Sequence, residues 1–237
     1  MSEKGEGLMQ EKTAACSWSS GKDSCLALYK AIKDGYRIER LFNFISRKYK
    51  RVSFHGATAE IVRLQSEAIG IPLIQKETTE ENYEESFRST LSELKARNIN
   101  RIVRGDIHLE DLRRWVEDVC NEQGIEVILP LWKQSPEMLL QEFIGLGFKA
   151  VLASVWAEKL DSSWVGRCID KEFLVDIKKT GCLDLCGENG EFHSFVYDGP
   201  IFSKRINLKK TGKVLIDGFW FLDIQEYGLE DKGEARQ

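Results

Sequence analysis

The sequence predicts an α/β protein: a Rossmann-like, doubly wound, five-stranded parallel sheet followed by a second, smaller α+β domain. Strand-like and helix-like segments alternate along residues 13–129, an order that favours a parallel sheet with helices on both faces. Residues 181–218 are rich in Gly, Asp and aromatic side chains, which indicates loops and short antiparallel strands. The predicted divisions are a flexible leader (1–12), a first domain (13–132), a second domain (133–227) and a flexible tail (228–237).

Five short runs that carry apolar residues are the predicted strands of the first domain. Such runs, bounded by turn residues, are typical of strands buried in a parallel sheet. They span residues 13–18, 41–45, 71–74, 101–104 and 126–129.

Apolar residues recur at helical spacing between these strands. The predicted helices span residues 24–34, 58–68 and 110–123, with a further helix that begins after residue 78. We expect Ile32 in the first helix and Leu112 in the last to face the core. Thr78 and Glu81 have the spacing of a capping box, which would begin the remaining helix.

The second domain opens on a helix start, because Ser135 is a good cap and Pro136 suits the first turn. This helix is expected to run to about Gly147, and residues 151–155 form the next predicted strand. The rest of the domain is expected to be α+β and to pack on the first domain.

Composition narrows the class of protein. A net charge of -4 argues against a broad nucleic-acid surface, which is usually basic. The first fifteen residues lack the apolar run of a signal peptide, and no segment approaches the roughly 20 apolar residues of a membrane span. We therefore expect a cytoplasmic protein whose six cysteines are free thiols, with Cys182 and Cys186 too isolated for a zinc site.

Residues 19–24 (Ser-Ser-Gly-Lys-Asp-Ser), the phosphate loop, stand between the first strand and the first helix. Small residues, converging amides and a helix N-terminus are what a phosphate site needs. Lys22 adds a positive charge, Ser19 and Ser24 add hydroxyls, and Asp23 is a candidate magnesium ligand or a partner that orients Lys22. The loop is not a Walker A motif, since Cys16 stands where that motif has Gly.

The end of the fourth predicted strand supplies two further candidates, Gly105 and Asp106. In a doubly wound sheet the carboxyl ends of the first and fourth strands can be neighbours at the point where the strand order reverses. Gly105 would let the backbone come close to the nucleotide.

The phosphate loop resembles the PP-loop of the N-type ATP pyrophosphatases, which usually reads Ser-Gly-Gly-x-Asp-Ser and belongs to the HUP-type folds. This chain has Ser20 where that family usually has Gly. Residues 187–195 resemble the Gly-Glu-x-Gly-Glu-Phe signature of the diphthine–ammonia ligase family, and residues 160–167 and 70–73 resemble other parts of it. The resemblance covers roughly residues 13–205. Trp18, Ser20 and the pair His193-Ser194 are more similar to a bacterial-type branch found in organisms that make no diphthamide.

The resemblance implies an ATP-dependent carbon–nitrogen ligase with ATP and Mg²⁺ as its cofactors. Such an enzyme adenylates a substrate carboxylate, releases pyrophosphate, and lets ammonia attack the acyl-adenylate. The acceptor would be diphthine on elongation factor 2 where the diphthamide pathway is present, and a homodimer is left open. Lys22 and Asp23, with Glu188 and Glu191, are the predicted catalytic residues.

The remaining site residues are assigned to binding. Phe44 and His55 join the phosphate loop, Gly105 and Asp106 as predicted nucleotide ligands; the predicted acceptor site comprises Asp161, Trp164, Arg167, Glu188, Asn189, Gly190, Glu191 and His193. Simpler interpretations stay open for several of these. Asn189-Gly190 can be an ordinary hairpin turn, and Arg167 can simply pair with Asp161.

Three rival functions remain. PP-loop enzymes also include tRNA sulfur transferases, which would use a cysteine such as Cys186. A related ligase can act on a small-molecule carboxylate, such as a cobalamin-pathway intermediate. A nucleotide-binding sensor without turnover is the third.

Overall fold

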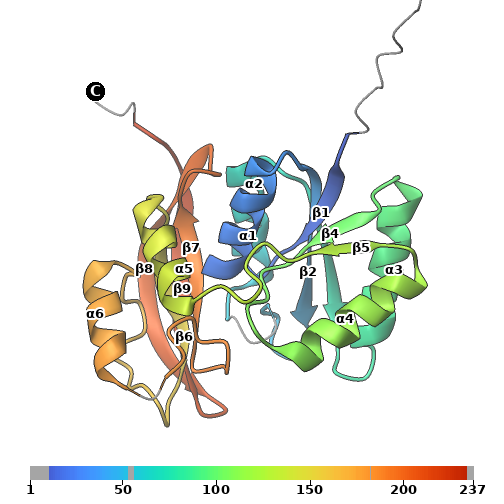
Figure 1. Ribbon diagram of the computed structural model, residues 1–237. Helices are drawn as coiled ribbons and strands as arrows, with labels where there is room; N and C mark the ends of the chain where they lie inside the picture. Colours follow the sequence, from blue (N-terminus) through green and yellow to red (C-terminus); the bar gives the residue numbers. More distant parts are fainter. Residues whose placement is uncertain (1–10, 53–55, 182, 234–237) are drawn as a thin grey trace, which may run out of the picture.

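Two β-sheets organise the chain, and the computed structural model describes residues 11–52, 56–181 and 183–233 of it (Figure 1). The first sheet is parallel, in the order β3-β2-β1-β4-β5, and the second is antiparallel, in the order β7-β6-β9-β8. The first contains β1 (Thr13–Ser17), β2 (Arg37–Ser46), β3 (Leu73–Thr78), β4 (Arg101–Val103) and β5 (Glu126–Ile128). The second contains β6 (Lys149–Trp156), β7 (Phe192–Asp198), β8 (Lys204–Ile216) and β9 (Phe219–Asp231). The predicted fold class is confirmed, and β1 and β4 are neighbours as expected.

Helices α1 and α2 form a layer that both sheets share (Figure 1). The helices are α1 (Lys22–Lys33), α2 (Ala59–Ile69), α3 (Tyr83–Ala96), α4 (Glu110–Glu122), α5 (Pro136–Gly145) and α6 (Lys171–Lys179). Helix α1 contacts β1 and β7, while α2 contacts β3, β8 and β9. Helices α3 and α4 cover the other face of the first sheet, and α5 and α6 contact each other in the second domain.

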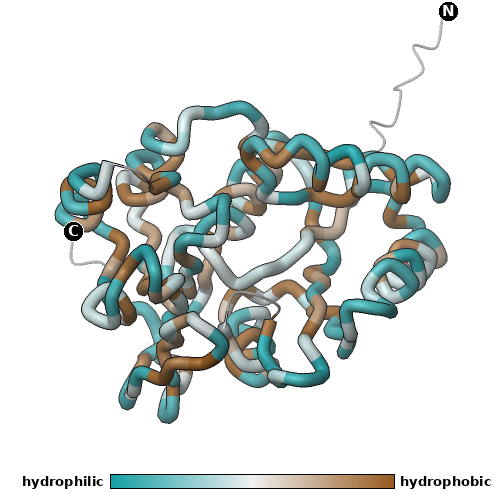
Figure 2. Tube along the Cα trace, turned by 90° about the horizontal axis from the view of Figure 1, so that it is seen from below, coloured by the Kyte–Doolittle hydropathy of each residue, from teal (hydrophilic) through white to brown (hydrophobic). Residues whose placement is uncertain are grey.

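The alternation of side chains along β2 separates two hydrophobic cores. Leu41 and Ile45 point into an inner core that extends from the first sheet through α1 and α2 to the second sheet. Phe42 and Phe44 point into an outer core beneath α3 and α4. The helices in Figure 2 alternate between hydrophilic and hydrophobic along their turns, as expected for helices with one buried face.

Two residues predicted to face the core are partly exposed instead. Ile32 is 41% exposed and Leu112 is 39% exposed. The buried stripe of α1 ends on the small residue Ala31, which turns Ile32 outward. In α4 the buried positions begin only at Val116, so Leu112 in the first turn lies beyond the core.

The capping box predicted at Thr78 is wrong. Thr78 is the last residue of β3, and α3 begins five residues later at Tyr83 with Asn82 as its N-cap. The side-chain oxygen of Asn82 accepts a hydrogen bond from the Thr79 amide at 2.7 Å. The side chain of the N-cap residue therefore binds an amide that precedes the helix.

The second domain has longer strands than predicted. Strands β8 and β9 have 13 residues each, and both central residues of their turn, Asp217 and Gly218, have positive φ, as the tight turn of a hairpin requires. Strand β9 runs to Asp231, so the tail predicted from residue 228 is wrong for its first four positions. Helix α6 was not predicted from the sequence. Within the described residues no helix has the length and apolar character needed to cross a bilayer.

Candidate functional site

The phosphate loop follows β1 and leads into α1, with Gly21 as the N-cap. Because Gly21 has no side chain, it cannot cap the helix by accepting hydrogen bonds from the first backbone amides of α1. Ser20 has φ +70°, in the left-handed region that glycine occupies without strain. The loop therefore needs the backbone conformation that Gly supplies in the usual motif, and Ser20 adopts it at the cost of strain.

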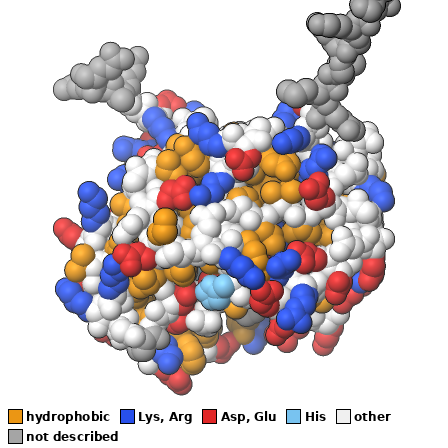
Figure 3. Space-filling view, in the orientation of Figure 1, with side chains coloured by type: hydrophobic (Ala, Val, Ile, Leu, Met, Phe, Trp, Pro, Cys, Tyr) orange, Lys and Arg blue, Asp and Glu red, His pale blue; other side chains and the backbone are white. Residues whose placement is uncertain are grey.

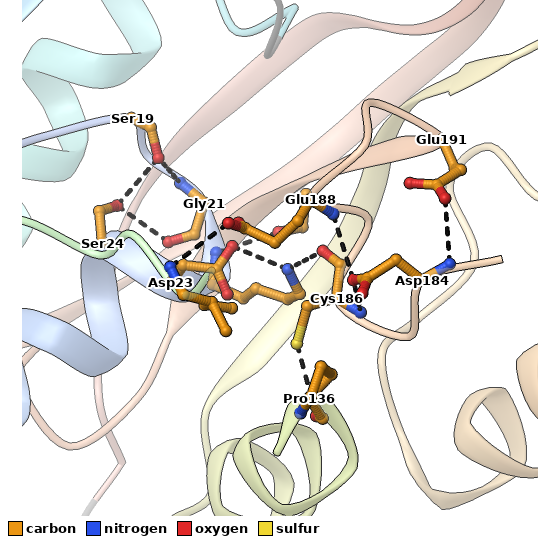
Figure 4. A network of polar contacts seen from close by, with 12 residues as sticks. Ser19, Gly21, Asp23, Ser24, Pro136, Asp184, Cys186, Glu188 and Glu191 are labelled. Carbon is orange, nitrogen blue, oxygen red and sulfur yellow. Dashed lines mark hydrogen bonds and ion pairs between the residues drawn. The ribbon is translucent and has the colours of Figure 1, made fainter. Parts of the chain in front are cut away.

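Hydroxyl groups inside the loop bond mainly to one another. The Ser19 and Ser24 side-chain oxygens are 3.1 Å apart, and the Gly21 amide donates to the Ser19 oxygen at 3.3 Å. The Ser24 hydroxyl also donates to the Gly21 carbonyl at 3.0 Å. These bonds hold the loop closed, and Figure 4 shows them at the start of α1.

Strand β7 of the second domain completes the loop from the other side. The Lys22 amide donates to the Ser194 hydroxyl at 3.0 Å, and the Val196 amide donates to the Ser20 carbonyl at 3.0 Å. A Cβ atom on Gly21 would lie 3.1 Å from the Ser194 carbonyl oxygen, so Gly21 permits this close approach. The hydrogen bond between Ser194 and the phosphate loop was not predicted from the sequence.

A buried glutamine joins the loop to both domains. The Gln65 side-chain nitrogen donates to the Ser20 carbonyl at 3.1 Å and to the Val196 carbonyl at 2.6 Å. Its oxygen accepts from the Trp18 indole at 2.7 Å. Gln65, in α2, is fully buried and was not among the predicted residues.

Lys22 is buried, and its ammonium group contacts both Asp23 and the second domain. Its Nζ lies 2.8 Å from a carboxylate oxygen of Asp23, donates to the Cys186 carbonyl, and lies 5.5 Å from the centre of the Phe192 ring. Burial is the largest single influence and would lower the Lys22 pKa. The charge and hydrogen bond of Asp23, together with Cys186 and Glu188, outweigh it and raise this pKa above its ordinary value. The lysine is therefore a permanent positive charge at the start of α1.

Two glutamates of residues 184–191, the acidic loop, differ in their surroundings. Glu188 accepts one hydrogen bond, from the Ile107 amide at 3.3 Å. Burial, with the nearby charge of Asp23, raises the Glu188 pKa to about 7, although Lys22 opposes the shift. Glu191 is buried and accepts from the Asp184 amide at 3.0 Å and from the Asn189 amide at 3.1 Å.

Asp184 fixes the other end of the acidic loop. Its carboxylate accepts from the Cys186 amide at 2.8 Å and the Glu188 amide at 3.2 Å, and a second oxygen lies 3.8 Å from His108. The position of Asp184 just before the Gly-rich block was the available signal, and it was overlooked. Asn189 and Gly190 belong to the same closed turn, with Gly190 at φ +85°.

Gly105 packs closely against the backbone at the start of α1. A Cβ on Gly105 would lie 2.7 Å from the carbonyl carbon of Asp23, which explains the need for glycine there. Asp106 forms two hydrogen bonds with the Arg104 guanidinium, at 2.7 and 3.0 Å. Phe44 packs in the outer core, with its ring centre 5.1 Å from that of Tyr83.

Arg167, Trp164 and Asp161 contact other residues of the second domain. Arg167 pairs with Asp176 at 2.5 Å and lies over the Trp164 ring at 4.9 Å, so the alternative pairing with Asp161 is wrong. Asp161 accepts from the Ser163 amide at 2.7 Å. His193 lies on β7, where burial and the charge of Lys22 lower its pKa to about 4, so its imidazole is neutral at pH 7. His55 lies outside the described residues.

The surroundings of Cys186 do not favour a reactive thiol. Burial raises the Cys186 pKa to about 12, and its thiol contacts the Pro136 carbonyl at 3.4 Å. Within the described ranges, no three His, Cys, Asp or Glu side chains gather as a metal site. A magnesium ion that reaches proteins with a nucleotide needs only one or two carboxylates, and Asp23 fits that role. On the face in Figure 3, acidic and basic side chains are interspersed.

Comparisons with known proteins place the whole described fold in context. A family model described as the diphthamide synthase N-terminal domain matches residues 11–127, and one for the diphthamide synthase C-terminal domain matches residues 135–230. A diphthine–ammonia ligase of Homo sapiens is 27% identical over 248 residues, covering 90% of this chain and 91% of the relative. That of Danio rerio is 27% identical over 252 residues, covering 92% and 96%. A Schizosaccharomyces pombe relative of the same name is 26% identical over 220 residues, 84% of this chain and 36% of its own length.

Proposed function

Because the chain belongs to the diphthamide synthase family, we propose that it is an ATP-dependent amide ligase that joins ammonia to a carboxylate. The acceptor carboxylate attacks the α-phosphorus of ATP, and pyrophosphate leaves. Ammonia then attacks the carbonyl carbon of the acyl-adenylate, the bond to AMP breaks, and the nitrogen gives up a proton. The enzyme class is carbon–nitrogen ligase of the ATP pyrophosphatase type.

The observation that carries this proposal is the buried ammonium group of Lys22 beside the amides of the phosphate loop. Pyrophosphate gains negative charge as it leaves, and a fixed cation in a partly dehydrated site stabilises that charge most in the transition state. Asp23 holds Lys22, and its carboxylate would also hold a magnesium ion, which would supply further positive charge for the phosphates.

Glu188 is the proposed proton acceptor in the second step. A carboxyl group with a pKa of about 7 is near half-ionised at neutral pH, which suits a general base. Its neighbours Asp23 and Lys22 place it beside the phosphate loop, where the acyl-adenylate would form. Glu191 instead shapes the loop that presents Glu188, because its carboxylate already accepts backbone amides.

The relatives' name, diphthine–ammonia ligase, supports diphthine as the acceptor. In this proposal diphthine is carried on elongation factor 2, and the enzyme acts in the cytoplasm. A different carboxylate is the alternative within the same chemistry. The tRNA sulfur transferase is disfavoured, because Cys186 is buried with a raised pKa and its sulfur already contacts a carbonyl. Whether two copies associate does not enter the mechanism.

Product analysis tests the proposal. Purified protein is incubated with labelled ATP, ammonium and candidate carboxylates, including diphthine-bearing elongation factor 2, and the nucleotide products are separated. We expect AMP and pyrophosphate in equal amounts with the amide product. Formation of ADP during turnover would rule out the pyrophosphatase type, and turnover without ammonium incorporation would rule out amide formation.

A further inference from the structure

Two amide side chains beneath the inner face of the first sheet lack hydrogen-bond partners. Both side-chain atoms of Asn43, the nitrogen and the oxygen, are buried without a partner, and so is the side-chain oxygen of Gln75. Asn43 on β2 and Gln75 on β3 are register partners, so their side chains stand next to each other on the same face of the sheet. Three unpartnered polar atoms therefore lie in one place.

The surroundings make this pair unusual. Asn43 is 4% exposed and lies on the same face of β2 as Leu41 and Ile45, which fill the inner core on either side of it. A buried donor or acceptor without a partner destabilises a fold by about 1–3 kcal/mol, so an apolar side chain would serve the core better. Retaining Asn43 here is understandable when a bound molecule supplies the missing partners.

The pair lies next to the phosphate loop. The Trp18 amide donates to the Phe42 carbonyl at 2.8 Å, so Asn43 is one residue from the bond that joins β2 to the residue preceding the loop. Asn43 also lies near the carboxyl end of β2, at the edge of the sheet where ligands of doubly wound folds bind. Gln75 is half-buried as a residue, and its side-chain oxygen is itself buried.

The orientation of Gln75 is set by its other contact. Its side-chain nitrogen donates to the Ala59 carbonyl at 3.3 Å, at the first residue of α2. The Gln75 oxygen must therefore face away from Ala59, as an acceptor. Together the pair offers two acceptor oxygens, from Gln75 and Asn43, and one donor group, the side-chain NH₂ of Asn43.

We propose that Asn43 and Gln75 read the base of the nucleotide and select adenine over guanine. Adenine presents an amino group with two hydrogens beside a ring nitrogen that accepts, which matches two acceptors and one donor. Guanine presents a carbonyl oxygen at the position of that amino group, and two acceptor oxygens would oppose it. The inference rests on the proposed use of ATP, and it assigns that specificity to two side chains of the first domain.

Equilibrium binding separates this inference from the ligase activity, because no acceptor or turnover is needed. The affinities of ATP and GTP are measured by calorimetry for the full chain and for Asn43→Leu, Gln75→Met and the double variant. We expect the unaltered protein to prefer ATP, and each variant to lose roughly 5- to 100-fold in that preference, as for other bidentate contacts to a base. Thr90→Val, a buried polar-to-apolar change in the outer core, is the matched control and should keep the preference.

Thermal unfolding without nucleotide is the second readout. Because Asn43→Leu removes unpartnered polar atoms, the free protein should be at least as stable as before, so a loss of ATP preference would not reflect misfolding. An unchanged ratio of ATP to GTP affinity, with lowered stability, would mean that an internal water satisfies the amides and would overturn base reading while leaving ATP use intact. Failure of the unaltered protein to bind either nucleotide would overturn both the inference and the proposed function.

Discussion

The phosphate loop and the acidic loop meet at Lys22, yet they are built in opposite ways. The phosphate loop takes much of its support from elsewhere, through Ser194 and Val196 on β7 and Gln65 on α2. The acidic loop is closed largely by its own carboxylates, Asp184 and Glu191. The first loop presents backbone amides and the cation of Lys22. In the second, the carboxylates of Asp184 and Glu191 bind the backbone of the loop that carries Glu188.

The comparison predicts its largest effect at Lys22. Lys22→Ala should lower the rate of AMP formation roughly 100- to 1,000-fold, the range for removing one preorganised group that stabilises developing charge. Radiolabelled ATP with chromatography measures this. Lys95→Ala, which alters an exposed lysine bonded to the Gln123 carbonyl, is the control and should keep full activity. Equal rates for both variants would remove Lys22 from the chemistry, whereas nucleotide binding without AMP formation by the unaltered protein would support a nucleotide sensor.

Glu188→Gln should have the next largest effect on rate, about 100-fold, because a positioned general base is lost. In the unaltered protein kcat should rise with pH through about 7, the Glu188 pKa, as the carboxylate forms. Quench-flow or steady-state rates from pH 5.5 to 8.5 check this. A variant that keeps the same pH profile would remove Glu188 from the chemistry.

The same shift has a consequence for stability. Because the folded-state pKa of Glu188 lies above its ordinary value of 4.5, the folded protein binds more protons between about pH 4.5 and 7. The contribution of Glu188 to the free energy of unfolding is therefore largest below that window and is lost as pH rises through it. Urea denaturation at pH 5 and 8 should show a smaller difference for Glu188→Gln than for the unaltered protein.

Glu191→Gln tests the structural half of the acidic loop. It leaves one amide of Asp184 or Asn189 facing a side-chain NH₂ group, so the free energy of unfolding should fall by about 1–3 kcal/mol. The pH profile of the remaining activity should still follow Glu188. Chemical denaturation, fitted with a common m-value, measures the change in the free energy of unfolding. A pH profile altered by Glu191→Gln would make Glu191, and not Glu188, the general base.

The smallest expected effect is at Ser20. Ser20→Gly should raise the free energy of unfolding by about 1 kcal/mol, since it removes a Cβ from the left-handed region and an unpartnered buried hydroxyl. Ser20→Ala is the matched variant, because it removes only the hydroxyl and keeps the strain. Equal stability for the two variants would show that backbone strain contributes nothing measurable here.

Local signals were enough to find the phosphate loop, because its residues are contiguous and its helix start follows directly from β1. The partners that complete it were beyond sequence reasoning: Ser194 is 172 positions from Lys22, and only the packing of β7 against α1 brings them together. Glu188 and Glu191 looked alike in the sequence, since the difference lies in which amides each carboxylate accepts.

Exposure was misjudged where helices end. Periodicity places Ile32 and Leu112 on an apolar stripe, but a stripe does not say how far the neighbouring layer extends. For Gly105 and Asp106 the structure shows contacts within the chain that periodicity could not predict, and their role in nucleotide binding stays a prediction. Gly105 is needed for a close approach, and the approaching atoms belong to Asp23 of the chain itself.

The layer of α1 and α2 also limits how this molecule can move. Both sheets pack on these two helices, so separating the halves would expose one continuous apolar interior to water. A wide clamshell opening is therefore unfavourable, and the protein-borne acceptor proposed above would have to reach the site without such a movement. Solution scattering with and without nucleotide should give nearly the same radius of gyration.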